Sequence, residues 1–170
     1  MNKAVQHLMN IKVNDEYGTP PLLFFEASKK FKISPKVDYA ASKVNHLCDK
    51  YYTMKDNSLL QTWNENGYLN PPYSKVEQFM HKAYHSWKQN NIDLLILVYA
   101  KTDTKWWHNY VEGKAEYHFI KGRVKFLDNN GNVILDKHGR EQSSPYPSVW
   151  IIYRRITTSR DFEMKQMFGD

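Results

Sequence analysis

The fold of this chain is decided by residues 68–100, which read YLNPPYSKVEQFMHKAYHSWKQNNIDLLILVYA. Ser74 and Glu77 form the S-x-x-E pattern of a helix capping box, and the apolar side chains after them recur at helical spacing, which predicts an amphipathic helix over residues 74–89. Residues 94–98 are a continuous apolar run, typical of a strand covered on both faces. A strand, a turn, a helix and a buried strand in this order predict a βαβ unit with parallel strands, and therefore an open α/β sheet.

Shorter elements are expected on both sides of this unit. Thr19 precedes two prolines and is interpreted as the N-cap of a helix that runs to residue 31, with a proline at its first position. Asn130-Gly131 is typical of a two-residue hairpin turn, so we expect a mostly parallel sheet with a C-terminal β-hairpin. The remaining predictions are a strand over 36–38, a short helix over 43–50, a helix over 104–111, a strand over 117–127 that returns at 133–135, and a last buried strand over 149–153.

The composition fits one compact domain. The chain has 170 residues, of which 41% are hydrophobic and 25% are charged, and no linker-like tract divides it. A mean hydropathy of -0.72 and the lack of a long apolar run argue against a membrane span. One cysteine and no secretory signal favour the reducing cytoplasm, and the net charge of +6 mildly favours polyanionic partners. We expect a single domain over residues 1–170, with residues 1–13 and 157–170 as flexible or accessory tails.

The turn Asn70-Pro71-Pro72-Tyr73 carries the clearest chemistry. The amine of adenine is a poor nucleophile because its lone pair is delocalised into the ring. The side-chain carbonyl of Asn70 and the main-chain carbonyl of Pro71 are expected to accept its two N–H groups and free that lone pair, while Pro72 keeps the turn rigid. Tyr73 offers a flat face to the base, which must be flipped out of a duplex. The alternative is a rigid structural turn in which Tyr73 only packs.

An amine activated in this way needs an electrophile. The methyl group of S-adenosylmethionine is the expected one, since its sulfonium leaving group requires neither a protein nucleophile nor a metal. Asp38, at the carboxyl end of a predicted strand, is placed where open α/β sheets bind ligands and can accept from ribose hydroxyl groups. Asp56 is a weaker candidate for the same contact, and a helix-capping or solvated acid is the alternative at Asp38.

From about residue 17 to 153 the chain resembles the phage-type DNA N6-adenine methyltransferases. The blocks that carry the resemblance, in the family's order, are Thr19-Pro20-Pro21, Asp38-Tyr39-Ala40-Ala41-Ser42, Asn70-Pro71-Pro72-Tyr73-Ser74, Lys101-Thr102-Asp103-Thr104-Lys105-Trp106, Gly122-Arg123-Val124-Lys125-Phe126 and Pro145-Tyr146-Pro147-Ser148. The resemblance implies a Rossmann-like class I methyltransferase core, S-adenosylmethionine as methyl donor and adenine in DNA as acceptor. It implies that Asn70, Pro71, Pro72 and Tyr73 are catalytic. The expected cofactor contacts also include Asp56, the weaker ribose candidate. The full set is Tyr17, Thr19, Pro20, Asp38, Ala40, Ala41, Asp56 and Asn70.

Two features depart from larger adenine methyltransferases. Their Gly-rich Phe-x-Gly-x-Gly turn is absent, and Ala40-Ala41-Ser42 stands in the corresponding stretch. No long segment is available for a separate target-recognition domain, so any sequence preference is expected from short loops or from the partner in a homodimer. Methylation of RNA adenine or of a glutamine amide suits the same turn, and a DNA-binding module without catalysis is a further alternative.

Basic side chains are expected to flank the site and to contact DNA, and this binding should weaken as salt rises. The candidate contacts are Lys75, Lys101, Lys105, Trp106, Arg123 and Lys125. A solvated basic face is the alternative for the charged members. Trp106 is included because adjacent helical residues point about 100° apart, so Trp106 and Trp107 are not expected to face the core together. One of the two is expected to reach DNA or a neighbouring chain, and packing at a loop is the alternative.

Two further signals are assigned ordinary roles. His81 and His85 lie four residues apart, a spacing that can bind zinc, but they fall on the solvated face of the predicted helix and no third ligand is in view. We therefore predict no metal site. Cys48, beside His46, is expected to be an inert thiol.

Overall fold

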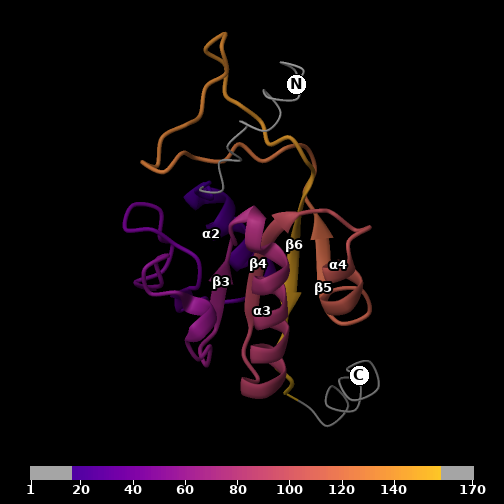
Figure 1. Cartoon of the computed structure of the whole chain (residues 1–170). Coiled ribbons are helices and arrows are strands. Elements are labelled where there is room, and N and C mark those ends of the chain that lie inside the picture. The colour runs from indigo at the N-terminus through magenta and orange to yellow at the C-terminus, as the bar shows by residue number, and fades with distance from the viewer. Residues whose placement is uncertain (1–16, 158–170) are drawn as a thin grey trace, which may run out of the picture.

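The structure is a computed structural model, and it describes residues 17–157. A six-stranded sheet lies between two layers of helices (Figure 1). One face of the sheet carries α3 (Val76–Asn90) and α4 (Lys105–Tyr110), and the other face carries α2 (Pro21–Phe31). The chain is therefore an α/β protein, as the sequence predicts.

The sheet has the strand order β2-β1-β3-β4-β6-β5. The strands are β1 (Val37–Asp38), β2 (Lys50–Tyr51), β3 (Gly67–Leu69), β4 (Leu94–Tyr99), β5 (Glu116–Phe119) and β6 (Ser148–Tyr153), and short 3₁₀ turns cover Ser58–Leu60 and Tyr73–Lys75. The first four strands are mutually parallel, whereas β6 is antiparallel to both β4 and β5. This arrangement confirms the parallel β3-α3-β4 unit and is consistent with a methyltransferase core.

The central strand β4 joins the two hydrophobic layers, because every one of its residues is buried. Alternate residues belong to the two core clusters: Leu94, Ile96 and Val98 on the side of α3 and α4, and Leu95, Leu97 and Tyr99 on the side of α2. A strand covered on both faces has no polar side, which explains why the sequence shows a continuous apolar run at this point.

Two local helix predictions differ from the structure. α3 begins at Val76, after the 3₁₀ turn, and its N-cap is Lys75 rather than Ser74, so the helix starts two residues later than predicted. No helix forms over residues 43–50. Asn45 Oδ1 instead accepts from the main-chain N–H of Ser42 at 2.6 Å and shapes a loop. Short polar side chains of this kind bond to nearby main-chain groups in competition with helical bonds.

The hairpin predicted between residues 117–127 and 133–135 is wrong in its partner strand, although the C-terminal strands are antiparallel. β5 and β6 are antiparallel neighbours, but a long excursion over residues 120–147, here called the arm, joins them in place of a tight turn (Figure 1). The Asn130-Gly131 turn lies within the arm, where Leu127 and Val133 form only an isolated antiparallel bridge. The strand predicted over residues 117–127 is correspondingly shorter.

Among residues 17–157, no helix combines the length and the apolar character that a membrane crossing requires. The tail predicted over residues 1–13 lies outside the described residues. So does the tail predicted over residues 157–170, except for its first residue.

Gly67 permits a close approach between β3 and the residue that follows β1. A Cβ at this position would stand 2.1 Å and 2.5 Å from two ring carbons of Tyr39. The Tyr39 ring cannot retreat, because it stacks on Trp63 with centroids 4.1 Å apart and its hydroxyl donates to the main-chain carbonyl of Glu65. Only glycine fits here without moving the ring.

Gly67→Ala is therefore expected to lower the free energy of unfolding by about 3 kcal/mol through overpacking. Gly113→Ala is the matched control. No atom lies within 4 Å of a Cβ at Gly113, and its φ of +70 accounts for a loss of about 1 kcal/mol. Equilibrium unfolding in denaturant measures both variants, and equal losses at the two positions would contradict the overpacking.

Candidate active site at the carboxyl edge of the sheet

The carboxyl edge of the parallel strands gathers segments from distant parts of the chain. Because β1, β3 and β4 are parallel, the segments that follow them leave the sheet at the same edge. β6 is antiparallel to β4, so its amino end and the end of the arm reach this edge as well. The topology thus places Asp38, Asn70 and Lys101 at one edge of the sheet.

Asn70 is held in one orientation. Its Nδ2 donates to the main-chain carbonyl of Tyr17 at 3.0 Å and to Thr19 Oγ1 at 3.1 Å. A main-chain carbonyl can only accept, so the amide atom that faces it must be the nitrogen. Oδ1 is the acceptor end that remains, and it takes none of the hydrogen bonds found among the described residues.

Thr19 is not a helix cap, contrary to the prediction. The N-cap of α2 is Pro20, without a side-chain hydrogen bond, and Pro21 occupies the start of the helix. The hydroxyl of Thr19 is shared instead between Asn70 and Tyr68, whose Oη lies 2.6 Å from Oγ1. Thr19 and Tyr68 are both buried. Sequence reasoning missed Tyr68, for which the available signal was a tyrosine in a buried strand whose hydroxyl needs a partner.

The arm holds the segment before α2 in place. The main-chain N–H of Gly18 donates to the carbonyl of Leu127 at 2.9 Å, and the N–H of Leu127 donates to the carbonyl of Gly18 at 2.8 Å. These two bonds form an isolated antiparallel bridge. The bridge fixes Tyr17 and Thr19, which lie on either side of Gly18. It therefore positions both acceptors of the Asn70 amide.

Tyr73 lies in an aromatic cluster that the sequence did not indicate. Its ring stacks on Tyr99, the last residue of β4, with centroids 3.9 Å apart and an angle of 9° between the planes. Tyr17 and Phe126 surround it at 6.1 Å and 6.5 Å. Tyr73 Oη is buried and makes no hydrogen bond of acceptable geometry with a described residue, and burial raises its pKa. One face of the Tyr73 ring is already covered, so a base can stack only on the other.

Asp38 organises the loop that follows β1. Asp38 is almost fully buried, and its two carboxylate oxygens accept from the main-chain N–H groups of Ala40 at 3.3 Å and Leu47 at 3.1 Å. The N–H of Ala41 donates to the segment after β2. Burial raises the pKa of Asp38 to about 6, while the two hydrogen bonds and nearby His46 act in the opposite direction. At pH 7 the loop therefore encloses a largely ionised carboxylate.

Asp56 has a different environment. It is exposed in the turn after β2, where its carboxylate accepts from the Oγ1 and the main-chain N–H of Thr53 at 2.7 Å and 2.8 Å. These hydrogen bonds lower the pKa of Asp56. The two candidate acids thus differ in burial, in partners and in the direction of their pKa shifts.

The basic residues predicted to contact DNA are all exposed: Lys75, Lys101, Lys105, Arg123 and Lys125. Lys101 Nζ lies 4.6 Å from the centre of the Tyr146 ring, and Arg123 donates to the carbonyl of Pro145 at 3.1 Å. Both cations therefore contact the turn that precedes β6. Lys125 forms an ion pair with Glu141 in the arm.

Trp106 does not belong to this surface, and the prediction that it reaches DNA is wrong. The exposed fractions of Trp106 and Trp107 are 5% and 3%. α4 packs against α3 on one side, and on another side Trp107 contacts Tyr117 and Phe119 of β5. A helix held between two partners buries two of its faces, which is why adjacent tryptophans are both covered.

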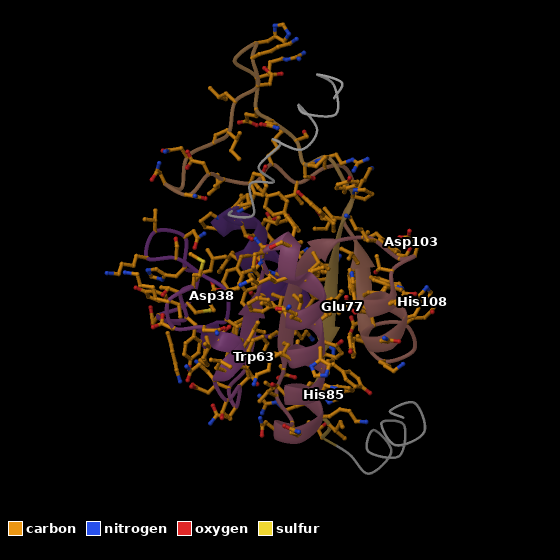
Figure 2. The ribbon with its side chains drawn as sticks, viewed as in Figure 1. Asp38, Trp63, Glu77, His85, Asp103 and His108 are labelled. Atoms are coloured by element: carbon orange, nitrogen blue, oxygen red, sulfur yellow. The ribbon has the colours of Figure 1, made fainter. Side chains whose placement is uncertain are left out.

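His81, His85 and Cys48 are the remaining titratable candidates. The rings of His81 and His85 lie 4.3 Å apart on α3, and no group of three potential metal ligands occurs within residues 17–157. Figure 2 shows His85 on α3, well separated from Asp38. Cys48 is buried, and burial raises its pKa to about 12, so the thiol stays protonated and unreactive.

The raised pKa of Asp38 predicts a pH-dependent stability. Between the unfolded value of 3.8 and about 6, the folded protein binds a proton that the unfolded chain has released, so stability falls as pH rises through this window. Asp38→Asn removes this effect, and from pH 4 to 7 its free energy of unfolding should rise relative to wild type by about 2 kcal/mol. Denaturant unfolding at several pH values measures the difference. Asn64→Ala, at an exposed position and without a titrating group, is the control and should follow the wild-type profile.

Comparison with known proteins supports the resemblance. The family model described as DNA N-6-adenine-methyltransferase (Dam) matches residues 7–166. A DNA N-6-adenine-methyltransferase of Escherichia phage T1 is 36% identical over an alignment that covers 73% of this chain, and the chain spans 65% of that relative's length. One of Haemophilus phage HP1 is 25% identical, with 92% of this chain and 97% of the relative covered. The chain belongs to the DNA N-6-adenine-methyltransferase (Dam) family.

Proposed function

We propose that the protein transfers a methyl group from S-adenosylmethionine to N6 of adenine in DNA, at the turn Asn70-Pro71-Pro72-Tyr73. The observation that carries this proposal is the fixed orientation of Asn70 in a member of this family: Nδ2 is bonded to the protein, so the side chain has Oδ1 available to accept from an amine. The position of this turn after β3, at the carboxyl edge, supports it further.

The chemistry of the turn lies in accepting two N–H groups of the target amine. Asn70 Oδ1 accepts one of them and the main-chain carbonyl of Pro71 accepts the other, which draws the nitrogen toward a tetrahedral form with its lone pair free. Acceptors that are already oriented need no rearrangement during the reaction, and one such group is worth about 3 kcal/mol of barrier. Pro72 limits the motion of the turn because its ring fixes φ.

Tyr73 supplies the platform for the adenine. Its ring is supported by Tyr99 on one face, so the extruded base stacks on the opposite face. Extrusion from a duplex is required because N6 is otherwise paired and out of reach of the turn.

The residues around β1 fit a cofactor with ribose hydroxyls and a cationic centre. Asp38 is a buried carboxylate whose oxygens already organise the loop, and the small side chains of Ala40 and Ala41 follow it. When bound, S-adenosylmethionine supplies a methyl group on a sulfonium leaving group. We place Asp38, Ala40, Ala41, Tyr17, Thr19 and Pro20 around it, with Asp56 as the second candidate for the ribose.

The exposed cations at the same edge are proposed to bind the DNA backbone. Lys101 and Arg123 both contact the turn before β6. Phosphate contacts of this kind make affinity fall steeply with salt.

Asn70→Ala tests the catalytic turn. Loss of an acceptor that acts in the transition state should reduce methylation at least about a hundredfold, with DNA affinity within about twofold of wild type. The assay uses methyl-labelled S-adenosylmethionine with duplex DNA, RNA and a glutamine-containing peptide in competition, followed by detection of N6-methyladenine. Asn64→Ala, at an exposed position before β3, is the matched control.

A wild-type protein that binds the cofactor but leaves N6 of DNA unmethylated would reject the assignment. Preferential labelling of RNA or of the peptide would move the proposal to that acceptor. If Asn70→Ala and wild type both bind DNA and neither methylates any substrate, the protein is a DNA-binding module.

Two substitutions of Tyr73 test whether its ring stacks on the adenine. Tyr73→Phe keeps the ring and removes a buried hydroxyl that makes no hydrogen bond of acceptable geometry within residues 17–157, so it should retain methylation within about twofold and lose no stability. Tyr73→Leu keeps similar volume without a flat face and should lower kcat/KM by about tenfold or more. Kinetics and thermal unfolding on the three proteins measure this, and equal activity of the Leu and Phe variants would exclude stacking by Tyr73.

A further inference from the structure

The direction of the Asn70 amide depends on a buried chain of hydrogen bonds outside the catalytic turn. Nδ2 of Asn70 is 3.1 Å from Thr19 Oγ1, and Oγ1 is 2.6 Å from Tyr68 Oη. The chain links residues that lie 51 and 49 positions apart in the sequence. It ends in the core, where Tyr68 is 1% exposed and packs edge-on against Phe24.

We propose that Thr19, held by Tyr68, is a positioning residue that keeps the Asn70 amide turned with Nδ2 toward the protein and Oδ1 toward the target amine. This inference rests on the proposed function of the turn. It assigns to Thr19 an action through Asn70, in addition to its place beside the cofactor.

The amide needs such a restraint because its two ends have opposite hydrogen-bonding character. In the reversed orientation Nδ2 would meet the N–H groups of adenine, donor against donor. The terminal torsion of an asparagine side chain is broad, so the single bond to the Tyr17 carbonyl leaves the amide plane free to swing about that contact. A second bond from a different direction, made by Thr19, restricts that motion.

Thr19 suits this role better than a more mobile residue. Its β-branched side chain is stiff about the first torsion, and its hydroxyl is locked in turn by Tyr68. The main chain of Gly18, the preceding residue, is fixed by the bridge to Leu127. Oγ1 is therefore a stationary acceptor for Nδ2.

The first experiment compares Thr19→Val, which removes the hydroxyl at nearly constant shape, with Thr19→Ser, which retains it. Single-turnover methylation at saturating DNA and cofactor should slow by about five- to tenfold in Thr19→Val, the effect of one lost hydrogen bond, and recover to within about twofold in Thr19→Ser. The dissociation constant for DNA should change by less than about twofold. Because cofactor is saturating in this assay, a change in S-adenosylmethionine affinity at Thr19 does not affect the measured rate. Thr62→Val, at an exposed position, is the matched control.

Tyr68→Phe extends the test one step into the core. Asn70 keeps both acceptors in this variant, but Oγ1 loses its anchor, so the rate should fall in the same direction and by less than in Thr19→Val. Thermal unfolding of each variant shows whether a lower rate merely follows a less stable fold.

A second readout does not depend on catalysis. The side-chain amide signals of Asn70, identified in ¹⁵N spectra by their absence in Asn70→Ala, should be sharp and slow to exchange with solvent in wild type. They should broaden or exchange faster in Thr19→Val and return to the wild-type form in Thr19→Ser.

The outcomes separate this inference from the proposed function. A wild type without methylation rejects the function, and the amide signals then decide the orientation by themselves. A Thr19→Val protein with the wild-type saturated rate and weaker cofactor binding, or with unchanged amide signals, would overturn the positioning role. So would a Thr19→Ser protein as slow as Thr19→Val.

Discussion

One side-chain nitrogen joins two separate segments of this protein, and a main-chain bridge joins a third segment to them. Asn70 Nδ2 donates both to the carbonyl of Tyr17 and to the hydroxyl of Thr19, which joins the end of β3 to the chain that enters α2. The arm is joined to the same place through Gly18 and Leu127. The direction of Asn70 Oδ1, the proposed catalytic acceptor, is thus set by the hydrogen bonds of Nδ2 in the same amide. Moving any of the three segments would change the direction in which Oδ1 faces.

The sheet explains why these segments can meet. Three parallel strands release their following loops at one edge, and the reversed strand β6 brings the end of the arm back to it. Aromatic side chains pack beside this edge, among them the stacked rings of Tyr73 and Tyr99. Rigid strands thus support a site made largely of turns, in keeping with the tendency of open α/β sheets to bind ligands at this edge.

The sequence was a good guide wherever a local pattern determines structure. The βαβ unit follows from helical periodicity and an apolar run, and the place of Asn70 follows from its position after a strand. The hydroxyl of Thr19 was assigned wrongly as a cap because its partners lie 49 and 51 residues away, beyond any local pattern. The burial of Trp106 depends likewise on α4 having two neighbours, and the stacking of Tyr73 depends on the end of another strand.

The insertion of β6 between β4 and β5 has a consequence for how this surface can diversify. The arm leaves from Phe119 and returns at Ser148, and the N–H of Ile120 donates to the carbonyl of Ser148 at 3.0 Å, so its two ends are adjacent. A segment closed by the sheet at its base can be lengthened or exchanged at a free-energy cost that grows only slowly with length. Within the arm, such exchanges must preserve the bridge at Leu127 and the buried side chains of Val124 and Phe126. The rest of the arm can change in length and sequence without disturbing the core.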